Sequence, residues 1–404
     1  MGRNKNISAV ITERQQQLDA VLQEVSGMES VMDRMKNLHQ QLLKKKDSII
    51  QSMNLHRGLV SALWRFPPEL LSLIFVRCLP ETEHLLPSSK LAPMLLTRIC
   101  RRWREVAVGM SSLWCGVIVD IDNEDWQRAA FCYDTWLKRS RDRPLSLALK
   151  CFKNDATDLR NLLEPHTNQI SSLHIILFVN PFTADLLLND FPALQEFTIT
   201  SSDPLWCTPS FAQSISRLPL TLRRLRVAGP SAFDFDLIVS CNPVWAHLTH
   251  VEITICQPNL ILQLLRLGPN LSSLEIGLGF HHEISLTFEP FTHMNLQSLC
   301  ISNASPMLMG NLFPGLFNAL TLPNLRALEA RYIRPWPHEE FKTFLVRSSC
   351  PLGSLTLGTG VTTTDEQRGE YIVLVPFLDV VVDPRRGGYF GYRRLVQHGR
   401  RRDV

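Results

Sequence analysis

Histidine, glutamate and cysteine side chains in this chain could bind a metal ion or act as nucleophiles if their spacing were suitable. In the stretch His338–Lys342 (HEEFK), lysine occupies the position where the HExxH zinc motif requires a second histidine. His281, His282 and Glu283 are adjacent, but no further ligands follow at a defined spacing, so we interpret them as a loop surface. The ten cysteines form no CxxC pair, which predicts reduced and mostly buried thiols. With no Walker loop or GxSxG motif either, we expect no metal, no cofactor and no catalysis.

The composition predicts a folded protein rather than a disordered one, because 45% of the 404 residues are hydrophobic and 20% are charged. A net charge of +4 is small for this length and gives no reason to expect nucleic acid. The N-terminus lacks the apolar region of a signal peptide, and the apolar run Tyr371–Val382 is too short to span a bilayer. We therefore expect a cytoplasmic or nuclear protein with no membrane partner. The basic end, residues 384–404, is interpreted as a flexible tail rather than a contact for RNA or acidic protein.

A small helical module is predicted between Phe66 and Trp114. Pro67 and Pro68 suit the entry and first turn of a helix, and the apolar residues that follow recur at helical spacing as far as Phe75. A second, longer helix is predicted from Leu95 to Ala107, with Trp103 on its apolar stripe as the anchor of a small core. These elements are arranged for docking rather than for chemistry.

The module resembles an F-box, in the variant common among mushroom-type fungal proteins. The matching segments are PPELL at 67–71, Ile74-Phe75, Cys78-Leu79-Pro80, CRRWR at 100–104, Leu113-Trp114, Trp136, LKRS at 137–140 and PLSL at 144–147. The resemblance implies docking to the adaptor subunit of a cullin-RING ubiquitin ligase. The residues that would contribute to this contact are Pro67, Leu70, Leu71, Ile74, Phe75 and Leu79. The alternative is that these residues only fill the module's own core.

Residues 1–62 are predicted to form an N-terminal helix with a heptad pattern from Ile11 to Met53. One core position holds Ile11, Leu18, Val25, Met32 and Met53, and the other holds Val21, Met28, Met35, Leu42 and Ile49. His39 and Lys46 interrupt the pattern. The methionines and Gly27 favour a weak or conditional dimer over a strong one. Self-association through residues 11–53 and packing of a lone helix on the rest of the chain both remain open.

Beyond the module, one pattern of apolar residues with two spacers and then one spacer occurs eight times. The patterns begin at Ile170, Leu194, Leu222, Leu248, Leu271, Leu296, Leu325 and Leu352, at intervals of 23 to 29 residues. Such a period indicates leucine-rich repeats, each a strand followed by a helix. Capping strands are predicted at Leu147 and Leu149 and, more weakly, at Phe377, Val380 and Val382. Helices are expected between strands at Phe211–Leu218, Leu260–Leu267 and His338–Arg347.

The spacers of these patterns should face away from the core, on the concave surface of a curved sheet. They are His174, Glu196, Thr198, Arg224, Arg226, His250, Glu252, Glu275, Glu329 and Arg331. As a set they are the predicted client-binding surface, although each alone could be an ordinary solvated position. Three residues after each pattern, only Cys256 fits the asparagine or cysteine ladder of regular repeats, so we expect an irregular arc.

The sequence thus predicts an α/β chain in four parts: an N-terminal helix (1–62), a small all-α F-box-like module (63–119), an irregular leucine-rich-repeat-type solenoid (120–383) and a basic tail (384–404). The predicted function is that of a non-catalytic receptor, which binds the ligase adaptor and cullin scaffold and holds a client protein. One alternative is a ligase-independent scaffold that dimerises through its N-terminal helix. Another is an enzyme whose site is distributed across the repeats.

Overall fold

The computed structural model describes residues 2–60, 66–120, 125–151, 157–177, 191–201, 217–229, 242–255, 260–278, 288–303 and 312–384. Five predictions lie outside these residues: the boundary between residues 62 and 63, the helix over Phe211–Leu218 except its last two residues, the ladder position of Cys256, the stretch His281–Glu283, and the tail from residue 385 onward. By its contacts the chain divides into two units, residues 1–71 and 72–404. No helix in the described ranges is long and apolar enough to cross a membrane.

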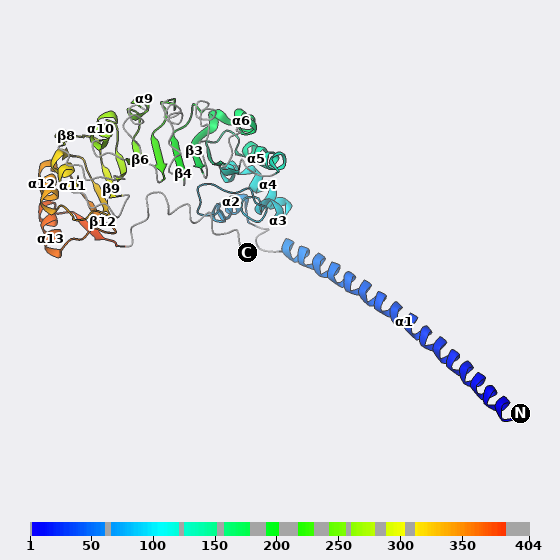
Figure 1. The fold of residues 1–404 in the computed structure, drawn as a ribbon. Coiled ribbons are helices and arrows are strands. Elements are labelled where there is room, and N and C mark those ends of the chain that lie inside the picture. The colour runs from blue at the N-terminus through cyan, green and yellow to red at the C-terminus, as the bar shows by residue number, and fades with distance from the viewer. Residues whose placement is uncertain are drawn as a thin grey trace. The chain divides into compact units, whose positions relative to one another are not determined.

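Helix α1 (Gly2–Val60) makes up most of the first unit, as Figure 1 shows. No proline interrupts it, which is why the helix can continue over its whole length. Every described side chain between residues 9 and 54 is exposed to solvent. The predicted N-terminal helix is therefore confirmed.

Helix α2 (Pro68–Arg77) begins at the proline pair, as predicted. The predicted single helix from Leu95 to Ala107 is wrong, because two helices occupy this stretch: α3 (Leu96–Ile99) and α4 (Arg101–Gly109). Between them the backbone of Cys100 is extended, and its Sγ accepts a hydrogen bond from the Trp103 amide at 3.5 Å. A cysteine N-cap carries none of the sequence signals that serine, aspartate, glycine or proline would give.

Paired tryptophans join the end of this module to the next helix. The 3₁₀ turn η2 (Ser111–Trp114) and helix α5 (Trp126–Ser140) bring the rings of Trp114 and Trp136 to 5.0 Å, edge to face. The Trp114 Nε1 donates to the Ala107 carbonyl at 2.9 Å, and the Trp136 Nε1 donates to the Trp114 carbonyl at 3.0 Å. Both indoles are buried with their N–H groups bonded, so this contact is specific as well as apolar.

A large, open parallel sheet forms the rest of the second unit; in the described residues it has eleven strands. In sheet order they are β1 (Gly116–Asp120), β2 (Leu145–Cys151), β3 (Ile170–Leu177), β4 (Glu196–Ser201), β5 (Arg224–Ala228), β6 (His250–Ile255), β7 (Ser273–Leu278), β9 (Ser298–Asn303), β11 (Ala327–Arg331), β12 (Ser354–Leu357) and β13 (Asp379–Val382). Strands β8 (Phe291–Thr292) and β10 (Leu320–Thr321) form a separate parallel pair. Neighbours in the main sheet thus follow the order of the chain.

The eight sequence patterns lie in register on eight successive strands. The central residue of each pattern, from Leu173 in β3 to Leu355 in β12, is paired with the central residue of the next. The first residue of every pattern is buried as well. An apolar layer therefore runs across the sheet, because the same strand position recurs on every neighbour.

The two ends of the sheet differ in detail from the prediction. Strand β2 lies at the predicted capping position, but β1 precedes it and begins at Gly116, inside the range expected for the all-α module. At the other end β13 is present, yet Phe377 is 93% exposed and Leu378 is buried in its place. The weaker capping strand is therefore present at Val380 and Val382, but Phe377 lies before it.

The described helices that follow β2 lie along one side of the sheet (Figure 1). They are α6 (Thr157–Leu163), η3 (Glu164–Gln169), α9 (Asn242–Trp245), α10 (Leu260–Leu267), α11 (Leu312–Ala319), α12 (His338–Ser348) and α13 (Asp365–Leu374). Helices α10 and α12 confirm two of the expected helices. Phe317, Phe341 and Phe344 join α11 to α12 through ring contacts of 5.3 to 6.0 Å.

His166 in η3 is a buried group with a predictable pH response. It is 8% exposed and its Nδ1 has no hydrogen-bond partner in the described structure, and burial lowers its pKa, against the opposing charge of Asp134. At pH values below the ordinary histidine pKa of about 6.5, His166 therefore binds a proton more readily in the unfolded chain than in the folded chain. We expect the free energy of unfolding to fall on acidification through this range, and to fall less in His166→Phe. Urea unfolding on either side of about pH 6.5 measures this, and equal losses in both proteins would contradict it.

Candidate functional site

The ten predicted client-binding residues lie on the side of the sheet opposite the buried pattern residues. Strand alternation places them there, since each neighbours a buried core position. The register sets Arg226, Glu252, Glu275, Cys300 and Glu329 level with one another on β5, β6, β7, β9 and β11. Together with Arg331, two residues beyond Glu329, we call these the charged row. His174 and Thr198 continue the same level on β3 and β4.

Ion pairs join neighbouring strands of this face. Arg224 Nη1 lies 2.8 Å from Glu196 Oε1, and both side chains are about half exposed, so this pair adds little stability. Arg226 Nε lies 2.6 Å from Glu252 Oε2, and here the glutamate side chain is only 17% exposed. The Arg226–Glu252 pair is therefore the more buried of the two.

Arg331 bridges two glutamates at the most buried point of the charged row. Its Nε lies 2.7 Å from Glu329 Oε1, and its Nη1 lies 3.3 Å from Glu275 Oε1, two strands away. Burial alone would lower the pKa of Arg331, but the hydrogen bond to Glu329 and the two carboxylate charges raise it overall. The guanidinium is therefore held charged between two carboxylates.

Cys300 lies between Glu275 and Glu329 in the register. Burial raises the pKa of its thiol, and the charge of Glu275 raises it further. A nucleophilic cysteine needs the opposite environment, one that stabilises the thiolate. Cys300 is consequently a protonated, inert side chain at neutral pH.

The histidines of this face form hydrogen bonds with neighbouring threonine hydroxyls. His174 Nε2 lies 2.9 Å from Thr200 Oγ1, and its ring lies 5.9 Å from that of His84, which bonds Ser146 at 2.9 Å. Burial lowers the pKa of His250, and the charge of Arg224 lowers it further. Among the described residues no group of three or more histidine, cysteine or acidic side chains is placed to hold a metal ion.

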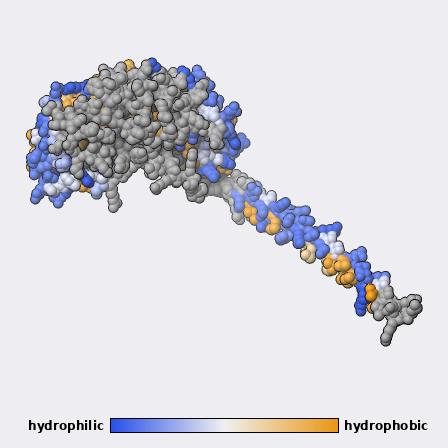
Figure 2. Space-filling view, in the orientation of Figure 1, coloured by the Kyte–Doolittle hydropathy of each residue, from blue (hydrophilic) through white to orange (hydrophobic). Residues whose placement is uncertain are grey.

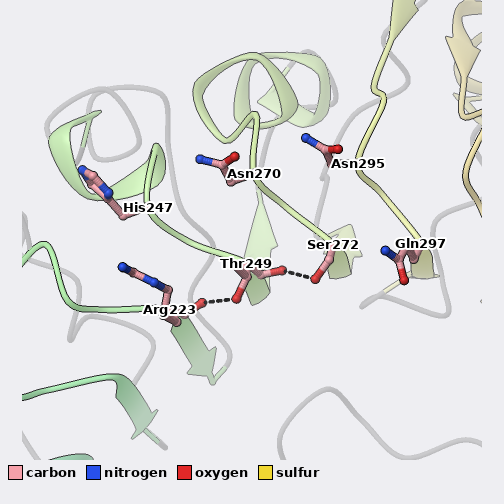
Figure 3. A pocket seen from close by; sticks show the side chains of 7 residues that line it. All are labelled: Arg223, His247, Thr249, Asn270, Ser272, Asn295 and Gln297. Atoms are coloured by element: carbon pink, nitrogen blue, oxygen red, sulfur yellow. Dashed lines mark hydrogen bonds between the residues drawn. The ribbon is translucent and has the colours of Figure 1, made fainter.

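An open polar groove of about 430 Å³ lies where strands β5, β6, β7 and β9 begin (Figure 3). Its lining residues are Arg223, His247, Thr249, Asn270, Ser272, Asn295 and Gln297. The hydroxyls of Thr249 and Ser272 donate to the carbonyls of Arg223 and Thr249, at 3.1 and 3.0 Å. These side chains satisfy backbone groups between strands, so the groove has a structural explanation.

An asparagine ladder, which the sequence did not lead us to expect, lines part of this groove. Asn270, Asn295 and Asn324 each donate from Nδ2 to a carbonyl of the preceding repeat, at 2.7, 2.9 and 2.6 Å. Thr221 occupies the equivalent position and donates to Pro192 at 3.0 Å. The missed signal is an asparagine directly before the first leucine of three patterns.

The predicted ligase-binding residues divide into two groups on α2. Leu71 and Phe75 are fully buried, with the Phe75 ring 4.9 Å from Trp103, which favours the alternative that these two residues fill the module's own core. Leu70 is 45% exposed, Pro67 is exposed, and Ile74 and Leu79 are half-buried. Leu73 and Val76, which the prediction omitted, are 64% and 48% exposed. Three-residue spacing from Leu70 would have identified both, because it repeats one helix face.

We call Leu70, Leu73 and Val76 the outward face of α2.

No known family model matches this chain, and no curated protein sequence matches it. The F-box resemblance therefore rests on the residues alone.

Proposed function

We propose that this protein is a non-catalytic receptor of a cullin-RING ubiquitin ligase, working in the cytoplasm or nucleus. The observation that carries the proposal is the outward face of α2. Leu71 and Phe75 already fill the inner side of this short helix, yet three further apolar side chains stand on the other side, exposed by 45 to 64%. Apolar residues in a row on the exposed side of a short amphipathic helix are typical of a docking site. The F-box resemblance names the partner as the ligase adaptor subunit, and through it the cullin.

We further propose that the parallel sheet belongs to an irregular solenoid of the leucine-rich-repeat type. Chain-order neighbours, a constant register and an asparagine ladder support this. In such an arrangement the face opposite the core is concave and receives the client. Its arginines and glutamates form ion pairs along β4 to β11, from Glu196–Arg224 through Arg226–Glu252 to the Arg331 bridge.

A face that carries charges of both signs fits a folded protein or peptide, which also carries both, better than a uniformly charged polymer. Nucleic acid would require a surplus of arginine and lysine, whereas the charged row contains three glutamates and two arginines. The proposed client is therefore a protein. Catalysis would belong to other subunits of the ligase, because the buried Cys300 thiol, whose pKa is raised, lacks the activation that a nucleophile needs.

The test is binding of the full chain to a purified adaptor–cullin complex, with Leu73→Asp/Val76→Asp as the variant. We expect at least about a 100-fold loss of affinity, since two carboxylates would be buried in an apolar contact. The fold should be retained because both side chains are exposed. Val373→Asp on α13 is the matched control, since this valine is 81% exposed and lies outside the module.

A ligase-independent scaffold is the second candidate, favoured by the exposed apolar side chains of α1. If neither wild type nor variant bound the adaptor–cullin complex while the chain still self-associated, the receptor proposal would be abandoned for the scaffold.

A further inference from the structure

Helix α1 carries an exposed apolar stripe that is wider than two heptad positions. Its large apolar side chains from Val10 to Met53 are between 41% and 67% exposed. Figure 2 shows them recurring along the helix between hydrophilic residues. Beside the two core positions, Val31 and Leu38 widen the stripe on one flank, and Leu22 and Leu43 widen it on the other. A stripe of this kind is suited to another helix of the same length.

A parallel, in-register pair of α1 helices would bring like charges together. Lys46 would meet Lys46 of the second copy, because equivalent core positions face each other in that arrangement. On the flanks, Glu24 would face Glu29 of the second copy, five residues further along. The glutamate contact occurs twice in such a dimer, and the lysine contact occurs once, on the twofold axis. Each of them opposes association.

The antiparallel arrangement removes these contacts, because each core position then faces the other kind of core position. With Met32 opposite Met35 of the second copy, Leu18 faces Ile49 and Val25 faces Leu42. Lys46 then faces Val21, and His39 faces Met28, so no like-charged pair remains in the core.

The same antiparallel register pairs the flanks by charge and by size. Glu24 faces Lys45 of the second copy, and Glu29 faces Lys36. The nearest acidic neighbour of Lys36 within its own helix is Asp33, at 3.5 Å with both side chains more than two-thirds exposed, a weak contact. Leu22 faces Leu43, and Val31 faces Leu38, so the widened stripe is covered as well.

We propose that α1 binds α1 of a second copy of this chain as an antiparallel coiled coil, with its twofold axis between Met32 and Met35. Charge complementarity selects this orientation, and the register follows from the position of the heptads. This dimer does not depend on the ligase proposal, since none of its contacts involves the outward face of α2.

Sedimentation of the chain over a range of concentrations measures the affinity of the dimer. The proposal is tested by the direction in which one substitution changes this affinity. Glu24→Lys should weaken the dimer about tenfold, because two attractive contacts with Lys45 become repulsive. Glu24→Lys/Lys45→Glu should restore the wild-type affinity. Glu13→Lys makes the same charge change on the outer side of the helix, at an exposed position away from the stripe, and should leave the affinity unchanged.

In a parallel dimer Glu24→Lys would instead tighten association, since the introduced lysine would face Glu29 of the second copy. Tightening, an unchanged affinity, or a wild-type chain that stays monomeric at every concentration would each overturn the proposal. Circular dichroism of each variant confirms that α1 remains helical.

Discussion

Trp114→Ala should lower the free energy of unfolding by about 3–5 kcal/mol, the range for removing a buried tryptophan. Trp114 is fully buried, and its ring contacts Trp136 edge to face at 5.0 Å. The Arg139 guanidinium lies 4.5 Å from the centre of the same ring. Alanine would remove both ring contacts and leave the Ala107 carbonyl without its donor. The cavity would lie where the helical module meets α5, so both should be destabilised together.

Urea unfolding, followed by circular dichroism, measures this loss. Phe131→Ala is the matched control, because Phe131 lies on α5 but is 72% exposed. Its removal should change the free energy of unfolding by no more than about 0.5 kcal/mol. A loss for Trp114→Ala no larger than that of the control would show that the tryptophan pair does not join the two elements.

Arg331→Met should cost about 1–3 kcal/mol, because it leaves two partly buried carboxylates without their shared cation. The Arg331 and Glu329 side chains are 19% and 17% exposed, and that of Glu275 is 32% exposed. After the substitution, water can therefore compensate the two carboxylates only partly for the lost guanidinium. Methionine keeps much of the side-chain length, so the loss reports mainly on charge.

Arg224→Met is the matched control on the same face of the sheet, since the Arg224 and Glu196 side chains are 57% and 44% exposed. We expect a change within about 0.5 kcal/mol there, as for most exposed ion pairs. Adding Glu329→Gln to Arg331→Met should recover part of the lost stability by removing one uncompensated charge. If Arg331→Met and Arg224→Met cost the same, the charged row would contribute no more to the fold than an ordinary solvated surface.

These two results also bear on how a client could bind. Pairs that stabilise the fold, such as Arg331 with Glu329 and Glu275, are already satisfied and offer a fixed charge pattern. Exposed pairs such as Arg224 with Glu196 can exchange partners at little cost. Client contacts should therefore depend more on residues at the β4–β5 end of the face than on Arg331, which would act by positioning its neighbours.

Much of the main sheet could be predicted from the sequence, because strand geometry imposes a short, local period. Leu173, Leu225 and Leu274 indicate β3, β5 and β7 by their spacing, and repetition of the spacing predicts that the strands are neighbours. The start of α2 at Pro68 and the extent of α10 were predictable for the same reason: helix entry residues and helical periodicity depend on adjacent residues.

Tertiary packing alone decided the rest. Cys100 breaks a continuous helical pattern because its backbone is extended there, which no local signal indicates. Leu71 and Phe75 are apolar like their exposed neighbours. The side of α2 that is buried is the one on which Phe75 contacts Trp103. Arg331 meets Glu275 across an intervening strand, 56 residues away in the sequence. The sequence by itself determined where α2 and α10 begin and which positions repeat from strand to strand, since these follow from local periods. Which side chains meet was left to the tertiary structure, because such contacts depend on residues that are distant along the chain.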